Sequence, residues 1–178
     1  MQTLNPQQLA DEGLAAYRKK EYLSAARKYN AAAESFKAAG DDLRAAEMAN
    51  NCSVAYLQGG DAQAALEAAM GTEAIFALKD NKKLQATALG NQAAALEKLH
   101  RLDEAMELYQ KSALIFDEIN ESELRAYVLQ AISSIQLRKR QFLEAYATLR
   151  LGIMGIKKPT LRQKVLKSLI QIPYKLIR

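Results

Sequence analysis

The sequence has few of the residues that define several other classes of protein. Its 178 residues include one cysteine, one histidine, three prolines and no tryptophan. The single cysteine, Cys52, excludes a disulfide framework and a cysteine-ligated zinc site, and the single histidine, His100, excludes a histidine-rich metal site. The sequence therefore predicts no metal or other cofactor.

Long apolar runs are missing as well. No run approaches the roughly 20 residues that a membrane-spanning helix needs. The first residues, Met1 to Asn5, lack the charged-then-apolar pattern of a signal segment. We expect a soluble, cytoplasmic protein.

Residues that break helices are scarce. The prolines are Pro6, Pro159 and Pro173, so none interrupts residues 7–158. Alanine is abundant, with 32 residues, and most of the remaining chain consists of other strong helix formers. The β-branched residues that sheets favour are few. The sequence therefore predicts an all-α fold.

The net charge of +5 is unevenly distributed. Residues 1–80 carry eight basic and 11 acidic side chains, whereas residues 81–178 carry 17 basic and nine acidic ones. From Gln136 onward there are 11 basic residues and one acid, Glu144. This bias can attract an acidic protein, nucleic acid or anionic lipid, and it is also compatible with a face that only keeps the protein soluble.

The chain resembles itself at a spacing of 40 residues. Two columns hold small residues and one holds large apolar residues. The columns are Gly13, Ser53, Ala93 and Ser133; Ala25, Ala65, Ala105 and Ala145; and Phe36, Phe76, Phe116 and Ile156. Helices packed about 8 to 10 Å apart need small residues where their backbones cross and large ones beside the crossing. We therefore expect the small columns to be buried at helix crossings.

Turn residues between the columns divide each repeat into two helices. The predicted helices are residues 7–19, 22–38, 42–58, 62–78, 82–98, 102–118, 122–138 and 142–156, with a ninth from about 161. Predicted N-caps are Asp41 or Asp42, Asn81 and Ser122, and Thr160 with Gln163 matches a capping box. The predicted organisation is one domain, 1–178, with repeats at about 2–40, 41–80, 81–120 and 121–158, a capping helix at about 160–173 and a short tail at 174–178.

Each repeat has a small residue midway along its first helix, then usually a large residue at the start of its second helix and an alanine three positions later. These residues are Gly13, Tyr22 and Ala25; Ser53, Ala62 and Ala65; Ala93, Leu102 and Ala105; and Ser133, Phe142 and Ala145. The pattern resembles the tetratricopeptide repeat (TPR) family, although the family repeat has about 34 residues. The resemblance implies a right-handed α-solenoid of four helix-turn-helix repeats with a C-terminal capping helix, acting as a scaffold for protein–protein interaction.

Catalytic motifs were sought and none was found. The chain has no Gly-rich phosphate loop, no cluster of metal ligands and no nucleophile beside a recognisable base. We therefore expect a protein that is not an enzyme. Cys52 is expected to pack in the core, and His100 to occupy a solvated turn.

The resemblance to TPR proteins implies that the first helix of each repeat lines a concave groove. The groove residues that it implies are Asn50, Asn51, Gln58, Thr87, Asn91, Lys98, Tyr127, Gln130, Ser134 and Arg138. The amides among them offer both a donor and an acceptor, which suits a peptide or helical segment of another protein, although they are also compatible with an ordinary wet face. The TPR subtype that grips a chaperone carboxylate would need cations at Thr87 and Asn91, so that partner is not expected.

The C-terminal helix has an apolar arc wider than capping requires. Leu161, Val165, Leu169 and Ile172 are expected to cover the fourth repeat, and Leu166, Ile170 and Tyr174 then form a C-terminal interface. We expect a homodimer or a docked partner at this interface. The alternatives are a tail that folds back over it and a membrane surface; nucleic acid is less favoured because few aromatic residues lie in the basic stretch.

Overall fold

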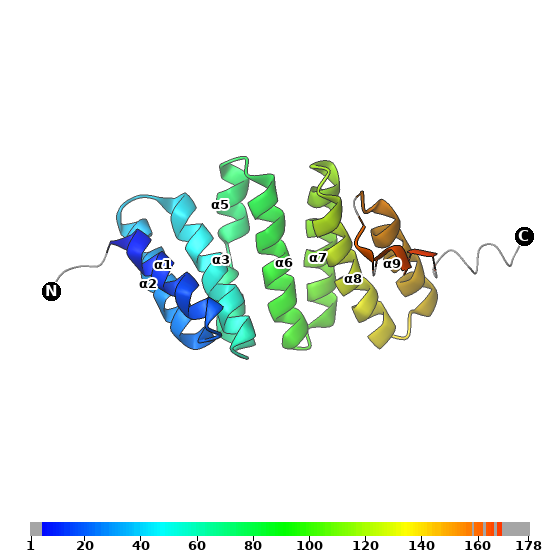
Figure 1. The fold of residues 1–178 in the computed structure, drawn as a ribbon, viewed down its shortest axis with the longest axis horizontal. Helices are drawn as coiled ribbons and strands as arrows, with labels where there is room; N and C mark the ends of the chain where they lie inside the picture. Colours follow the sequence, from blue (N-terminus) through cyan, green and yellow to red (C-terminus); the bar gives the residue numbers. More distant parts are fainter. Residues whose placement is uncertain (1–4, 158, 162, 166, 169–178) are drawn as a thin grey trace, which may run out of the picture. The chain divides into compact units, whose positions relative to one another are not determined.

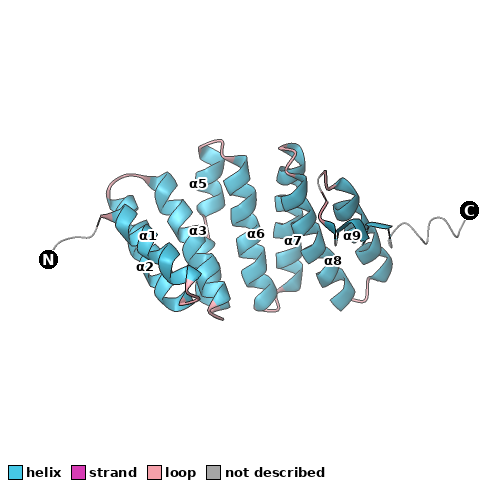
Figure 2. Ribbon diagram, viewed as in Figure 1, coloured by secondary structure: helices cyan, strands magenta, loops and turns pink. Residues whose placement is uncertain are grey.

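The structure is a computed structural model that describes residues 5–157, 159–161, 163–165, 167 and 168. These residues form helices and turns, and no strand occurs among them, as Figure 2 shows. The helices are α1 (Pro6–Arg18), α2 (Tyr22–Ala38), α3 (Asp42–Gln58), α4 (Ala62–Ala69), α5 (Thr72–Leu78), α6 (Lys82–Lys98), α7 (Leu102–Glu118), α8 (Ser122–Arg138) and α9 (Phe142–Gly155) (Figure 1). The predicted all-α class is confirmed for the described part of the chain.

Turns recur every 20 residues and share one backbone geometry. A left-handed residue with φ between 53° and 88° stands at Lys20, Gly40, Gly60, Asp80, His100, Asn120 and Arg140. At the end of α2, for example, Gly40 N donates to the Lys37 carbonyl at 3.0 Å and Asp41 N donates to the Phe36 carbonyl at 2.9 Å. This pair of bonds is the Schellman motif, which satisfies carbonyls that the helix end leaves open. The same pair recurs at all seven turns, so the helix-turn period is half of the 40-residue spacing in the sequence.

The period also decides which residue caps the next helix, because the cap follows directly after the left-handed residue. Asp41 and Asn81 are confirmed as N-caps, since each Oδ1 accepts a backbone N–H three residues later, at 3.1 Å. The prediction for Ser122 was wrong, because the left-handed turn at Asn120 places Glu121 at the cap and makes Ser122 the first residue of α8.

The predicted helix 62–78 was also wrong, because the chain leaves the helix between α4 and α5. Met70 is extended and Gly71 has a φ of 80°, which a residue without a Cβ adopts at no steric cost. The Ala69 carbonyl, which the break frees, accepts the Thr72 hydroxyl at 2.7 Å and Gln92 Nε2 of α6 at 3.0 Å. The break is therefore fixed by a partner on another helix.

The chain divides into two compact units, Met1–Leu108 and Tyr109–Arg178, with the boundary inside α7. In the first unit, α1 packs on α2, α2 on α3, α3 on α4 and α5, and α6 on α4 and α5. Its core contains the predicted small residues Ala25 and Ala65, both fully buried. A Cβ added to Gly13 would lie 2.9 Å from the ring of Tyr29, so this site of the small column requires glycine.

In the second unit, α8 packs on α9. The hydroxyl of Ser133 donates to the carbonyl of Ala145 at 2.8 Å, and both residues are buried. Two small columns of the sequence therefore meet at this helix crossing, as predicted. The last large residue of its column, Ile156, is buried too.

The chain after α9 begins its helix as predicted but does not cover the fourth repeat as predicted. The capping box is confirmed, with Thr160 N donating to Gln163 Oε1 at 2.8 Å and Gln163 N to Thr160 Oγ1 at 3.4 Å. The expected cover by Leu161 and Val165 was wrong, because these side chains are 79% and 55% exposed. The physical reason is that the chain becomes extended at Ile156, so α9 stops short of the 20-residue register. The predicted positions Leu166, Leu169, Ile170, Ile172 and Tyr174 lie outside the described residues.

Candidate peptide-binding surface

Six of the predicted groove residues lie on α3 and α6 of the first unit. These two helices contact each other directly, and both pack on α4 and α5 (Figure 1). The spacing of three and four residues places Asn51 and Gln58 on one face of α3, and Thr87, Asn91 and Lys98 on one face of α6. We call the surface formed by these five residues and Asn50 the α3–α6 face.

An amide pair joins the two helices. Asn91 Nδ2 donates to Asn50 Oδ1 at 3.3 Å, across 41 residues of sequence. Asn50 is only 6% exposed, and its own Nδ2 has no hydrogen-bond partner. Leaving such a buried donor unsatisfied costs about 1 to 3 kcal/mol. Asn91 is half-buried and is therefore the member of the pair that a ligand can reach.

The residues around the amide pair are small or exposed. Gly90 and Ala94 on α6 and Val54 on α3 are half-buried, and Asn51 is exposed. The Thr87 hydroxyl donates to the Lys83 carbonyl at 2.9 Å, so its proton is used inside α6. The polar contacts that this surface offers therefore come from the asparagine amides, with Gln58 and Lys98 exposed at the helix ends.

The other four predicted residues belong to the second unit. Tyr127, Gln130, Ser134 and Arg138 lie at intervals of three and four residues on α8, and all four are exposed. They form one face of that helix. The structure thus assigns the predicted groove residues to two surfaces, one on each unit.

Cys52 lies beside the site in sequence but has a different role. It is buried, and its Sγ donates to the Ala26 carbonyl of α2 at 3.3 Å. Burial raises the pKa of the Cys52 thiol to about 11, so at neutral pH it stays protonated and is a poor nucleophile. Its predicted place in the core is confirmed. Within the described ranges, no three metal-ligating side chains come together.

The second unit also contains a hollow that the sequence did not predict. About 320 Å³ lies between α7, α8 and α9, lined mainly by Ala113, Leu114, Leu129, Ile132 and Leu151. At its edge, Arg125 forms an ion pair with Asp117 at 3.1 Å. Its residues come from three helices and share no sequence motif, so no pattern could have revealed it.

No known protein family matches the sequence, and no curated protein was found to be similar to it. Among the described residues, no helix has both the length and the apolar character needed to cross a bilayer.

Proposed function

We propose that the protein is a non-catalytic interaction module of the TPR type, which binds a peptide or helical segment of another protein on the α3–α6 face. The observation that carries the proposal is the Asn50–Asn91 pair with its unsatisfied Nδ2. The 20-residue period of turns and the buried small columns favour the right-handed solenoid architecture that the TPR resemblance implies.

The amide pair suits the backbone of a peptide because it can offer either a donor or an acceptor. Amide nitrogen and oxygen are similar in size, so the Asn50–Asn91 bond can form with either residue as the donor. In both arrangements one polar atom of buried Asn50 lacks a partner, so neither arrangement gains a full bond over the other. Asn91 can therefore present its oxygen to a peptide N–H or its Nδ2 to a peptide carbonyl while it remains bonded to Asn50.

The small residues near the pair let a main chain approach. Gly90 and Ala94 flank Asn91 with little side-chain volume, and Val54 adds an apolar contact on α3. In this arrangement Asn91 is the contact residue and Asn50 is the buried positioning residue. Affinity then comes from amide hydrogen bonds and apolar contact, and we expect it to depend only weakly on salt.

Peptide selection with the purified chain tests this function. Binders selected from a random-peptide display library are synthesised and titrated by calorimetry against wild type, Asn91→Ala and the control Asn30→Ala. Asn30 is exposed on α2, where its amide bonds only to Glu34. We expect Asn91→Ala to weaken binding by about tenfold, as the loss of one or two hydrogen bonds predicts, and Asn30→Ala to leave it unchanged.

Circular dichroism of each variant establishes that the fold is kept. Peptides that bind Asn91→Ala as tightly as wild type would contradict the proposal, and so would a selection that yields no binder.

A further inference from the structure

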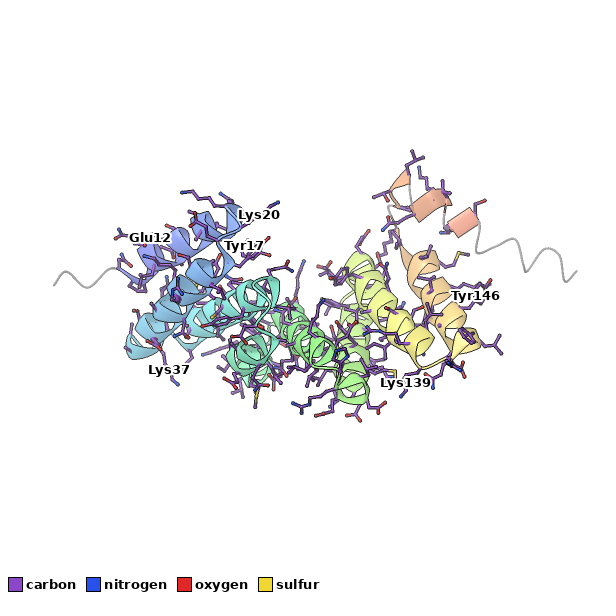
Figure 3. All side chains as sticks on the ribbon, turned by 90° about the horizontal axis from the view of Figure 1, so that it is seen from below. Glu12, Tyr17, Lys20, Lys37, Lys139 and Tyr146 are labelled. Atoms are coloured by element: carbon purple, nitrogen blue, oxygen red, sulfur yellow. The ribbon has the colours of Figure 1, made fainter. Side chains whose placement is uncertain are left out.

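The turn between α8 and α9 combines exposed apolar side chains with a cluster of cations. We define the α8–α9 tip as residues 137–143, which read Leu-Arg-Lys-Arg-Gln-Phe-Leu. Phe142 and Leu143 are 64% and 83% exposed, and Leu137 is 51% exposed. Between them the three basic side chains are also exposed. Figure 3 shows Lys139 at this turn and Tyr146 on the following helix.

The equivalent turn between α1 and α2 has a similar sequence but covers its apolar residues. There Arg18, Lys19 and Lys20 are followed by Glu21, Tyr22 and Leu23. The ring of Tyr22 packs edge-on against Tyr17, with centroids 5.4 Å apart. The Leu23 side chain lies against Gly59, close to where a Cβ would be. The α8–α9 tip is therefore distinguished by its exposed apolar pair and not by its charge.

We propose that the α8–α9 tip docks on an anionic lipid surface. Phe142 and Leu143 would enter the boundary between headgroups and acyl chains, while the aliphatic stems of the basic side chains lie along it and their charges meet lipid phosphates. Each cation near an anionic surface contributes about fivefold to partitioning. The proposal does not depend on peptide binding by the α3–α6 face, because it rests on different residues.

Charge decides between a lipid surface and a second copy of the chain. A symmetric dimer through this turn would place two copies of Arg138, Lys139 and Arg140 against each other, and such like-charge contact is unfavourable. The one acid within three residues of the tip is Glu144. A lipid surface of opposite charge has no such penalty.

The shape and the apolar residue types disfavour nucleic acid. Binding to single-stranded nucleic acid relies on aromatic rings that stack on bases. The tip has one aromatic residue, Phe142, and its most exposed apolar side chain is Leu143. An aliphatic side chain gains little from base stacking but gains free energy when it enters the acyl boundary.

Vesicle sedimentation provides a test with a matched control. The full chain is mixed with vesicles of phosphatidylcholine alone or of phosphatidylcholine with phosphatidylserine. The test variant is Arg138→Gln/Lys139→Gln/Arg140→Gln, and the control is Arg18→Gln/Lys19→Gln/Lys20→Gln, which removes the same charge from the equivalent turn. We expect wild type to sediment with the phosphatidylserine vesicles, the tip variant to lose roughly a hundredfold in partitioning, and the control to keep most of it.

A fluorescent reporter tests the insertion of the apolar pair. The chain contains no tryptophan, so Phe142→Trp introduces a single indole at an exposed position. We expect its emission to shift to the blue when phosphatidylserine vesicles are added and to stay unshifted in the Arg138→Gln/Lys139→Gln/Arg140→Gln background.

Four outcomes would overturn the proposal. These are the absence of wild-type sedimentation, an equal loss in both triple variants, an unshifted emission in sedimented protein, and single-stranded DNA binding that exceeds vesicle binding. Each variant lies at exposed positions, and circular dichroism establishes that its helices are retained.

Discussion

Replacing Phe76 by alanine is expected to lower the free energy of unfolding by about 3 to 5 kcal/mol, as the truncation of a fully enclosed aromatic ring does. Phe76 has no exposed surface and packs with Ala46 of α3 and Ala88 of α6. Its neighbours are small, so they have little side chain with which to fill the resulting cavity. Urea unfolding followed by circular dichroism measures the loss.

Leu78 provides the control for Phe76, because it lies on the same helix but is exposed. Leu78→Ala is expected to change the free energy of unfolding by less than about 0.5 kcal/mol. A loss below about 1 kcal/mol for Phe76→Ala would contradict the packing of α3, α5 and α6 around this ring.

The second expected effect concerns the small column of the repeat. Ala105 on α7 is fully buried, like Ala25, Ala65 and, nearly so, Ala145. Leucine at this position adds volume where the surrounding atoms leave no exposed surface, and overpacking of this kind costs about 1 to 3 kcal/mol. The same unfolding measurement applies to Ala105→Leu.

The matched control is Ala74→Leu, which makes the same substitution at an exposed position of α5. It is expected to be nearly neutral. If the two variants are equally stable, then the small column does not mark close helix packing and the repeat register is wrong.

The helix boundaries could be predicted because the repeat carries the turn positions from one unit of sequence to the next. Gly40 and Gly60 are ordinary turn residues, and the 20-residue period extends them to Lys20, His100 and Arg140. These three residues adopt the left-handed conformation that favours glycine, so residue type alone would not have identified them. The register supplied what local propensity could not.

The break between α4 and α5 could not be predicted in the same way. One glycine in a helical pattern costs only about 1 kcal/mol and is often tolerated. At Gly71 the balance is decided by Gln92, whose Nε2 bonds to the freed Ala69 carbonyl from another helix. Tertiary contacts of this kind do not appear in a one-dimensional pattern.

The candidate site was predicted as a set of positions but not as a set of contacts. Columns at a spacing of 40 residues align Asn51 with Asn91, which are equivalent positions of successive repeats. The bond that joins α3 to α6 instead links Asn91 to Asn50, 41 residues away. Equivalence in a repeat and adjacency between its helices are different relations, and only the structure gives the second.

Burial at the second surface was likewise beyond the sequence. The turns at Lys20 and Arg140 are both followed by an aromatic residue and a leucine. Leu23 is 47% exposed because it packs beside Gly59, whereas Leu143 is 83% exposed. The same residue types are thus part of a packed contact in one repeat and part of an exposed tip in another.

The most direct test of peptide binding is a nuclear magnetic resonance titration of the isotope-labelled protein with a peptide selected by display. The α3–α6 face predicts that the side-chain amide resonances of Asn50 and Asn91 shift together with backbone amides of α3 and α6. Shifts confined to α2, α4 and α5, with both asparagine side chains unchanged, would contradict it.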